Sequence, residues 1–356
     1  MCVPAPFQVR VRQTEGIPVE KENPAALQTL SPASSGKSKL QPHRIVTSSQ
    51  FIVLCLLIIV WIVGSITAPA MLQRDNLINV IRGSAITGMF ALAATLVLLV
   101  GEIDLSLGST MVFALIIGSK LYGVTSDIVM IIATLVAGAL LGLFNGIVIT
   151  VFKVKSLMAT LGTMSLFGGL AYFLSSGKVA LFYQAPNYLW MGKGMILGIP
   201  VPVVFSVVIF VVLFIFLHLT KFGKEVYFTG ANPLAAWMSG VNIKRIKLII
   251  FVLAGLFATL GGLFQSALLN EVGPSYGAGG YEMTGLSIAI FGGTSMAGGK
   301  GSILSTALAA ITFQLLLNVL TLSGLGTYME QVFKGLFLII IVISFQNLER
   351  KRYAKL

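Results

Sequence analysis

Two carboxylates stand one residue apart in a stretch that is rich in glycine and serine. Glu102 and Asp104 lie between Gly101 and Gly108, directly after a long apolar segment. A carboxylate at bilayer depth costs about 2.5–3.5 kcal/mol, so these side chains should face protein or a water-filled path. On a helix the two would point to different sides, whereas on extended backbone they would share one. The glycines permit a break in the helix at this point.

Residues 101–109, here named the acidic loop, admit more than one role. Ser106 and Ser109 can hydrogen-bond the backbone groups that a broken helix leaves free. The carboxylates could couple transport to protons or ions, contact a polar substrate, or brace an interfacial turn. We favour bracing or gating over substrate binding, because the orientation given below places the loop on the cytoplasmic side.

A second glycine-rich stretch, residues 292–302, is here named the glycine turn and contains a Gly-Lys dipeptide. A phosphate-binding loop requires a glycine five residues before that dipeptide and Ser or Thr after it. Thr294 and Gly301 occupy those two places instead. We therefore expect a close-packed hairpin at the inner surface and no ATP site. Its glycines are Gly292, Gly293, Gly298, Gly299 and Gly301.

No other residues have the types and spacing of a catalytic or metal site. His43 lies in a polar N-terminal stretch, His218 ends an apolar segment, and the two cysteines are far apart. Neither a metal-ligand spacing nor a Ser/His/Asp set is present. The sequence predicts no catalytic residue, no metal and no cofactor, which argues against a membrane enzyme.

Three further acids flank a glycine-rich segment near the ends of the later apolar segments. Glu271, Glu282 and Glu330 could line an outer vestibule through which a substrate first enters. Carboxylates in such places are more often solvated helix ends, and we favour that interpretation.

The composition indicates that these residues belong to a membrane protein. Hydrophobic residues make up 56% of the 356 residues and charged residues only 10%, whereas a soluble domain carries about a quarter charged residues. Apolar runs of about 20 residues recur, which predicts an all-α, polytopic fold. The ten expected spans are near residues 51–68, 79–100, 109–124, 127–151, 157–175, 199–218, 248–268, 282–296, 303–322 and 331–346.

Basic residues predict the orientation and the domain organisation. Most of the 24 Lys and Arg residues fall on one side if the N-terminal segment is cytoplasmic and the spans alternate, so both termini should be cytoplasmic. Residues 1–49 and 348–356 are expected to be basic cytoplasmic tails around a membrane domain, residues 50–347. The net charge of +12 then indicates contact with anionic lipid and not with nucleic acid. Small-residue pairs such as Gly138/Gly142 and Gly168/Gly169 predict close helix packing.

The loop of residues 219–247 predicts a short helix of its own. Asn232 is a suitable N-cap, and Pro233 suits the first helical position. Gly240 can end the helix in a left-handed conformation. A helix of about two turns is marginal in water unless something packs on it. It either lies on the bilayer or docks on a separate protein. We favour docking, through a smooth face at Ala235 and Ala236 and contact area from Trp237 and Met238.

This loop resembles the coupling region of bacterial ABC permeases of the ribose-type carbohydrate-uptake family. The family pattern is Gly-x-Asn-x-x-Ala-Ala-x-x-Ser-Gly-Ile/Val, with Pro233 and Trp237 at variable places. The acidic loop is similar to the family's Gly-Gly-Ile-Asp-Leu-Ser-Val-Gly-Ser motif, with Glu102 in place of a glycine. Residues 159–163 and the glycine turn are also similar to family motifs. The matching coupling residues are Gly230, Asn232, Ala235, Ala236, Ser239, Gly240 and Val241.

The resemblance implies a transport subunit in a bacterial inner membrane, without an ATPase site of its own. Its partners would be a cytoplasmic ATP-binding subunit, a second permease copy (identical or related), and a periplasmic or surface sugar-binding protein. The substrate would be a monosaccharide such as ribose, with the autoinducer-two furanosyl signal as an alternative. An ion-coupled secondary transporter would explain Glu102 and Asp104 but not the capped loop helix, and a scaffold or sensor role is weaker still.

Overall fold

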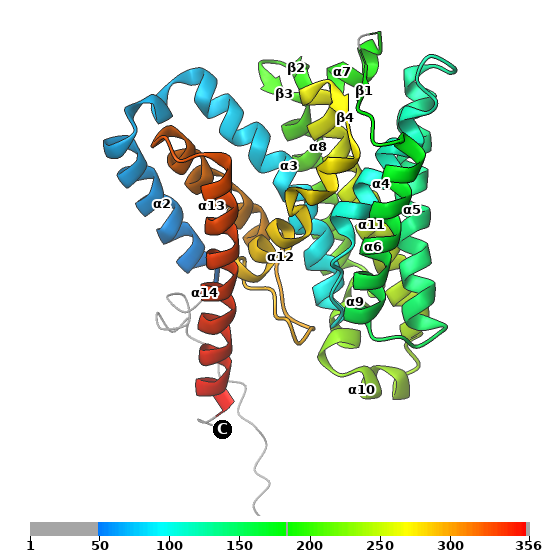
Figure 1. Cartoon of the computed structure of the whole chain (residues 1–356). Helices are drawn as coiled ribbons and strands as arrows, with labels where there is room; N and C mark the ends of the chain where they lie inside the picture. Colours follow the sequence, from blue (N-terminus) through cyan, green and yellow to red (C-terminus); the bar gives the residue numbers. More distant parts are fainter. Residues whose placement is uncertain (1–48, 183, 354–356) are drawn as a thin grey trace, which may run out of the picture. The chain divides into compact units, whose positions relative to one another are not determined.

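Each of the ten predicted spans overlaps a helix in the computed structural model, which describes residues 49–182 and 184–353 (Figure 1). The described residues belong to one compact unit, whereas residues 1–48 of the predicted N-terminal tail lie outside the described residues. The ten helices are α2 (Ser49–Thr67), α3 (Arg74–Leu99), α4 (Leu107–Ser119), α5 (Asp127–Thr150), α6 (Ser156–Ser175), α8 (Val201–Leu219), α11 (Ile243–Leu269), α12 (Tyr281–Phe291), α13 (Ile303–Leu322) and α14 (Thr327–Tyr353).

Within the described residues, seven of these helices are long and apolar enough to cross a membrane. Helix α4 has 13 residues and α12 has 11, which corresponds to about 20 Å and about 16 Å at the helical rise. The hydrocarbon core is about 30 Å thick, so neither helix crosses it alone. The chain is a multi-pass, mainly helical membrane protein, and the count of ten spans remains a prediction.

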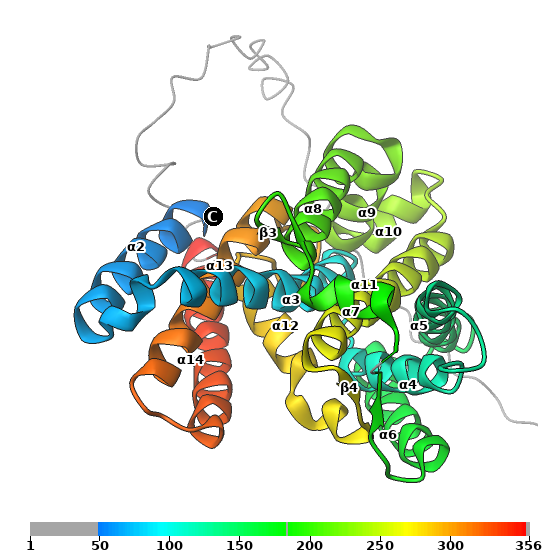
Figure 2. The same cartoon turned by 90° about the horizontal axis from the view of Figure 1, so that it is seen from above.

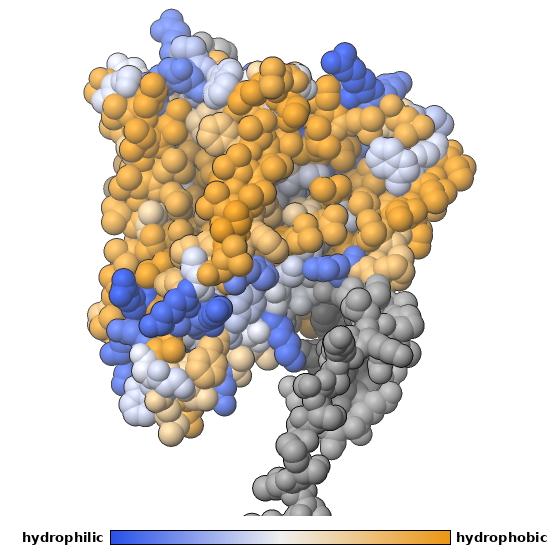
Figure 3. Space-filling view, turned by 180° about the vertical axis from the view of Figure 1, so that it is seen from behind, coloured by the Kyte–Doolittle hydropathy of each residue, from blue (hydrophilic) through white to orange (hydrophobic). Residues whose placement is uncertain are grey.

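Helices α3 and α11 form the buried centre of the unit. In their most apolar windows, 78% of the α3 residues and 67% of the α11 residues are buried, against 11% for α2. Helix α3 packs against α11, α12 and α13, and Figure 2 shows it between the side formed by α2 and α14 and the side formed by α5 and α6. The outer helices expose large apolar side chains, which gives the apolar surface of Figure 3 that contact with lipid requires.

Glycines of α5 allow a close approach to α11, as the sequence predicts for Gly138 and Gly142. A methyl group on Gly142 would lie 2.2 Å from the carbonyl oxygen of Phe251, so any larger residue would push the helices apart. Gly169 makes no such close approach within the described chain. A methyl group there would meet no atom of the described chain within 4 Å.

Short elements cover the end of the unit that is opposite α10 (Figure 1). Strand β1 pairs antiparallel with β4, and β2 with β3. The Asp127 carboxylate at the start of α5 accepts the Asn187 N–H of α7 at 2.6 Å, which ties this cover to a long helix. These elements are β1 (Ala180–Leu181), α7 (Pro186–Lys193), β2 (Met195–Ile196), β3 (Ile199–Pro200) and β4 (Glu271–Val272). The fold also contains two short 3-10 helices, η2 (Pro69–Leu72) and η3 (Pro274–Gly279).

Candidate functional site

The loop between α8 and α11 folds into two helices, α9 (Lys221–Ala231) and α10 (Pro233–Met238). Asn232 separates them, and its Oδ1 accepts the backbone N–H of Ala235 at 3.0 Å. Pro233 stands in the first turn, where its missing N–H costs no hydrogen bond. The predicted N-cap and helix start are confirmed.

The predicted glycine stop is also present at the other end of α10. Gly240 has a φ of +81°, a conformation that favours glycine. The Val241 N–H then donates to the Ala236 carbonyl at 3.0 Å, as in a left-handed helix end. Ser239 is the C-cap residue and lies just outside the helix.

Helix α10 has one buried side and one exposed side. Ala236 is fully buried, because this side of α10 packs on α9 and α11. The sequence predicted Ala235 and Ala236 as the face that receives a partner, and for Ala236 this is wrong. Leu234, Trp237 and Met238 are 66%, 67% and 75% exposed. These three side chains, here named the α10 surface, form an exposed apolar patch of the kind that marks an interaction site.

The acidic loop interrupts the helical structure between α3 and α4, as predicted. Gly101 has a φ of +75°, and residues 102–104 have no regular secondary structure. Gly108 and Ser109 lie buried in the first turn of α4. The two carboxylates engage different partners, and so do not act as a pair.

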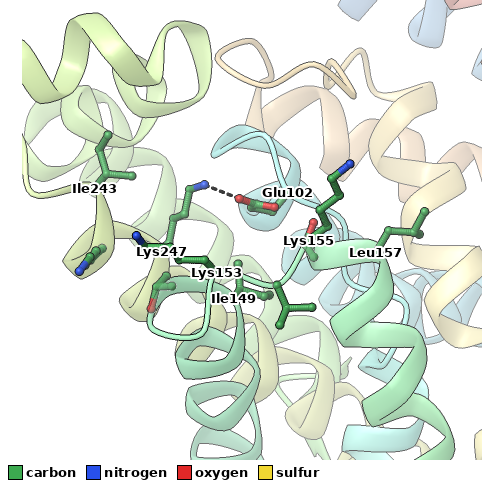
Figure 4. A pocket seen from close by; sticks show the side chains of 11 residues that line it. Glu102, Ile149, Lys153, Lys155, Leu157, Ile243 and Lys247 are labelled. Atoms are coloured by element: carbon green, nitrogen blue, oxygen red, sulfur yellow. Dashed lines mark hydrogen bonds and ion pairs between the residues drawn. The ribbon is translucent and has the colours of Figure 1, made fainter. Parts of the chain in front are cut away.

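Glu102 points to the start of α11, where its carboxylate forms an ion pair with the Lys247 ammonium (Figure 4). The two side chains are only 14% and 19% exposed, so water screens the pair less than a surface pair. The ion pair joins the acidic loop to the helix that follows α10.

Asp104 is buried and points to Ser106. Its Oδ1 accepts the Ser106 N–H at 2.8 Å and the Ser106 hydroxyl at 2.6 Å. The Asn145 amide of α5 donates to the same hydroxyl at 2.7 Å. Burial raises the pKa of the Asp104 carboxyl, and the hydrogen bonds from Ser106 lower it in part. With these partners, Asp104 braces the loop.

The acidic loop is also bound to α6. The Ile103 N–H donates to Ser156 Oγ at 3.2 Å, and the Thr160 hydroxyl donates to the Ile103 carbonyl at 3.4 Å. Thr160 belongs to the 159–163 stretch singled out above, so two of the motifs meet here. Asn145 was not predicted. A lone amide inside an apolar span is the signal that could have found it.

Three segments that are far apart in the sequence meet at a junction of glycines. Gly230 of α9 lies so close to α3 and the glycine turn that a methyl group on it would be 1.9 Å from the Leu99 carbonyl and 2.5 Å from the Gly299 nitrogen. A methyl group on Gly298 would be 2.8 Å from both the Gly101 Cα and the Gly230 carbonyl. We name Gly101, Gly230, Gly298 and Gly299 the glycine junction.

Hydrogen bonds hold this junction together. The Gly299 N–H donates to the Leu99 carbonyl at 3.0 Å, and the Tyr227 hydroxyl of α9 donates to the Gly301 carbonyl at 3.2 Å. Backbone touches backbone with no side chain between, so a displacement of α9 must move its neighbours. The loop that carries α10 is thus in direct contact with the helix core.

The fold, the acidic loop and the capped loop helix can be compared with known proteins. Residues 76–342 match a family described as the branched-chain amino acid transport system, permease component. This match spans most of the chain. The chain belongs to this permease family.

Relatives of this permease align over most of their length. It is 36% identical over 302 residues to the ribose import permease protein RbsC of Bacillus subtilis (strain 168), covering 84% of this chain and 92% of that protein. It is 31% identical over 294 residues to the ribose import permease of Escherichia coli (strain K12), covering 82% and 91%. It is 30% identical over 285 residues to a xylose/arabinose import permease of Sulfolobus acidocaldarius, covering 78% and 79%. No solved structure matches the chain.

The glycine turn of the permease uses its backbone amides inside the chain. The Ser295 N–H donates to the Lys300 carbonyl at 2.8 Å, and the Gly298 N–H to the Ser295 carbonyl at 3.1 Å. Gly293, Gly298 and Gly299 all have φ between +68° and +88°. A phosphate cradle needs its amides free to face the ligand, so this geometry supports the predicted close-packed hairpin.

The three acids near the ends of the later spans, Glu271, Glu282 and Glu330, differ in their surroundings. Glu282 is only 5% exposed, so its interpretation as a solvated helix end is wrong. Glu271 accepts the Tyr276 hydroxyl at 2.7 Å, and Glu330 accepts the Thr321 hydroxyl at 2.7 Å. Glu330 thereby joins the end of α13 to the start of α14, and Glu271 joins β4 to η3. A role for any of the three in a vestibule stays a prediction.

Proposed function

We propose that this chain is the membrane-spanning subunit of an ATP-driven importer and forms the path for a monosaccharide. Ribose or a similar pentose or hexose is the substrate we favour, because two of the relatives above are ribose import permeases and a third is a xylose/arabinose import permease. The autoinducer-two furanosyl signal is an alternative substrate. A bacterial inner membrane with both termini in the cytoplasm is the location we propose.

The single observation that carries this proposal is the contact, at the glycine junction, between the helix core and the loop that joins α8 to α11 and carries α10 (the α10 loop). A separate ATP-binding subunit would dock on the α10 surface, formed by Leu234, Trp237 and Met238. Movement of α10 would pass through α9 and Gly230 to the acidic loop and the glycine turn. The permease needs no covalent chemistry, because a transport cycle only requires different stabilisation of two states.

The remaining partners follow from the same proposal. A sugar-binding protein would deliver the substrate at the end covered by α7 and the short strands, and a second permease copy, identical or related, would complete the path. An ion-coupled mechanism is less well supported, since Glu102 is paired with Lys247 and Asp104 with Ser106.

The test is uptake of labelled ribose, arabinose and xylose by cells that contain the permease, its binding protein and its ATP-binding subunit. We expect uptake to stop without the ATP-binding subunit and to continue when an ionophore removes the proton gradient while ATP is maintained. The opposite pattern would overturn the proposal.

A matched pair of variants tests the docking surface. Trp237→Ala should lower both uptake and copurification of the ATP-binding subunit at least tenfold. Trp190→Ala, which removes a 45% exposed tryptophan from α7 at the other end, should leave that copurification unchanged. Equal effects of the two variants would count against docking at α10.

A further inference from the structure

A basic pocket opens beside the acidic loop, at the end of the unit that carries α10 (Figure 4). Its volume is about 550 Å³, within the range of small-molecule sites. The end of α5, the turn of residues 151–155, the start of α6 and the start of α11 form its walls. Charged side chains at its rim are Glu102, Lys153, Lys155, Lys244 and Lys247.

The charges of this pocket are unbalanced. Glu102 is the one acid in its lining and is already paired with Lys247. Among the described residues, Lys153, Lys155 and Lys244 form no ion pair. Three lysines from two different walls therefore line a cavity that has no unpaired acid in its lining, which favours an anion.

Helix α6 adds to this preference. It begins at Ser156, in the pocket wall, and its N-cap residue Lys155 gives no side-chain hydrogen bond to the first turn. The first N–H groups of a helix carry a partial positive charge. The helix end strengthens the field of the lysines but would not make a site without them.

The surface next to the pocket is apolar and exposed. Leu157 lines the pocket, and Leu161 stands one turn further along the same side of α6. Phe152 and Met158 beside them are 71% and 66% exposed, and both leucines are 46% exposed. Figure 3 shows hydrophilic residues at the α10 end directly below a broad apolar surface. A ligand in the pocket can thus extend from charged groups onto lipid-facing side chains.

We propose that this pocket binds the phosphate headgroup of an anionic phospholipid, whose acyl chains lie along Leu157, Leu161 and Met158. A basic pocket between helices at the membrane surface is a recognised lipid-headgroup environment. A free phosphate would use the lysines but not the apolar track. An acidic side chain of a protein partner would likewise leave that track unused. Because Glu102 of the acidic loop also lines the pocket, with Lys247 as its partner, the headgroup would lie beside that loop.

The test titrates the full-length chain in a neutral detergent with phosphatidylglycerol or phosphatidylcholine and counts bound lipid by native mass spectrometry. We expect phosphatidylglycerol to bind at least tenfold more tightly. Inorganic phosphate and glycerol 3-phosphate are added as competitors, and the titration is repeated with the ATP-binding subunit bound. The pocket variant carries three substitutions, Lys153→Gln, Lys155→Gln and Lys244→Gln.

A control variant removes three exposed lysines from the other end of the unit, through Lys120→Gln, Lys178→Gln and Lys193→Gln. The pocket variant should lose most of the preference for phosphatidylglycerol, while the control should keep it. Changing the pocket lysines to arginine should also keep it, which separates loss of charge from misfolding. Equal binding of the two lipids, or equal loss in both glutamine variants, would overturn the proposal. So would full displacement by millimolar phosphate, or loss of lipid on assembly with the ATP-binding subunit.

Discussion

A methyl group on Gly298 would lie 2.8 Å from the Gly101 Cα and from the Gly230 carbonyl oxygen. Gly298→Ala should therefore force the α10 loop away from the helix core and lower uptake at least tenfold at equal amounts of protein in the membrane. Gly123 is the matched control, because its φ of +75° is similar but its methyl group would meet nothing within 4 Å in the described chain. Both variants bear the cost of left-handed backbone, about 1–2 kcal/mol. Equal losses of uptake would show that crowding at Gly298 is unimportant.

The Glu102–Lys247 ion pair can be measured by a double-mutant cycle. Either single change, Glu102→Gln or Lys247→Met, leaves a largely buried charge without its partner, so the double variant should recover part of the lost stability. We expect a coupling energy of about 0.5–3 kcal/mol from thermal unfolding in detergent. The surface pair Lys221–Glu225, whose lysine is 92% exposed, should give no more than about 0.5 kcal/mol. A coupling energy for the Glu102 pair that is no larger would contradict its structural role.

At the scale of the elements, the two sides of α10 should respond differently. Ala236 is fully buried and Trp237 is 67% exposed. Ala236→Glu places a carboxylate inside the packing of α10 on α9, which costs stability as well as partner binding. Trp237→Ala should lower partner binding alone. Thermal unfolding and copurification of the ATP-binding subunit, measured on both variants, check this. Loss of stability in the Trp237 variant would contradict the assignment of the α10 surface.

The start of α10 depends on the cap at Asn232. Asn232→Ala removes the acceptor of the Ala235 N–H and should cost about 0.5–2 kcal/mol. Asn232→Asp keeps the acceptor and should cost little. Proteolysis of the loop that carries α10 in the folded permease should then be faster for the alanine variant only. Similar rates for the alanine and aspartate variants would mean that α10 is stabilised by its packing and not by the cap.

Across the whole molecule, local patterns predicted elements better than they predicted contacts. The ten helices and the α10 caps follow from hydropathy and from Asn232, Pro233 and Gly240, since these signals act within a few residues. The glycine junction joins residue 101 to residues 230 and 298, and no local rule specifies such long-range contacts. The sequence does not predict the burial of Ala236 and Glu282, because this burial depends on how whole helices pack: α10 on its neighbours α9 and α11, and α12 on the distant α3. In the sequence, Lys247 is one of several basic residues of the 219–247 loop, and only the structure pairs it with Glu102.

For the whole molecule, the sequence also predicts the orientation in the membrane, with both termini in the cytoplasm. Leu197 and Trp237 are 98% and 67% exposed and lie beyond opposite ends of α8, whose 19 residues extend about 28 Å. In a chain whose native Cys2 and Cys55 are changed to Ser, a membrane-impermeant maleimide should label Leu197→Cys in intact spheroplasts. It should label Trp237→Cys only after permeabilisation, because the positive-inside rule places α10 in the cytoplasm. The reverse labelling pattern would mean that the protein has the opposite orientation in the membrane. Labelling of both cysteines in intact spheroplasts would mean that α8 does not cross the membrane.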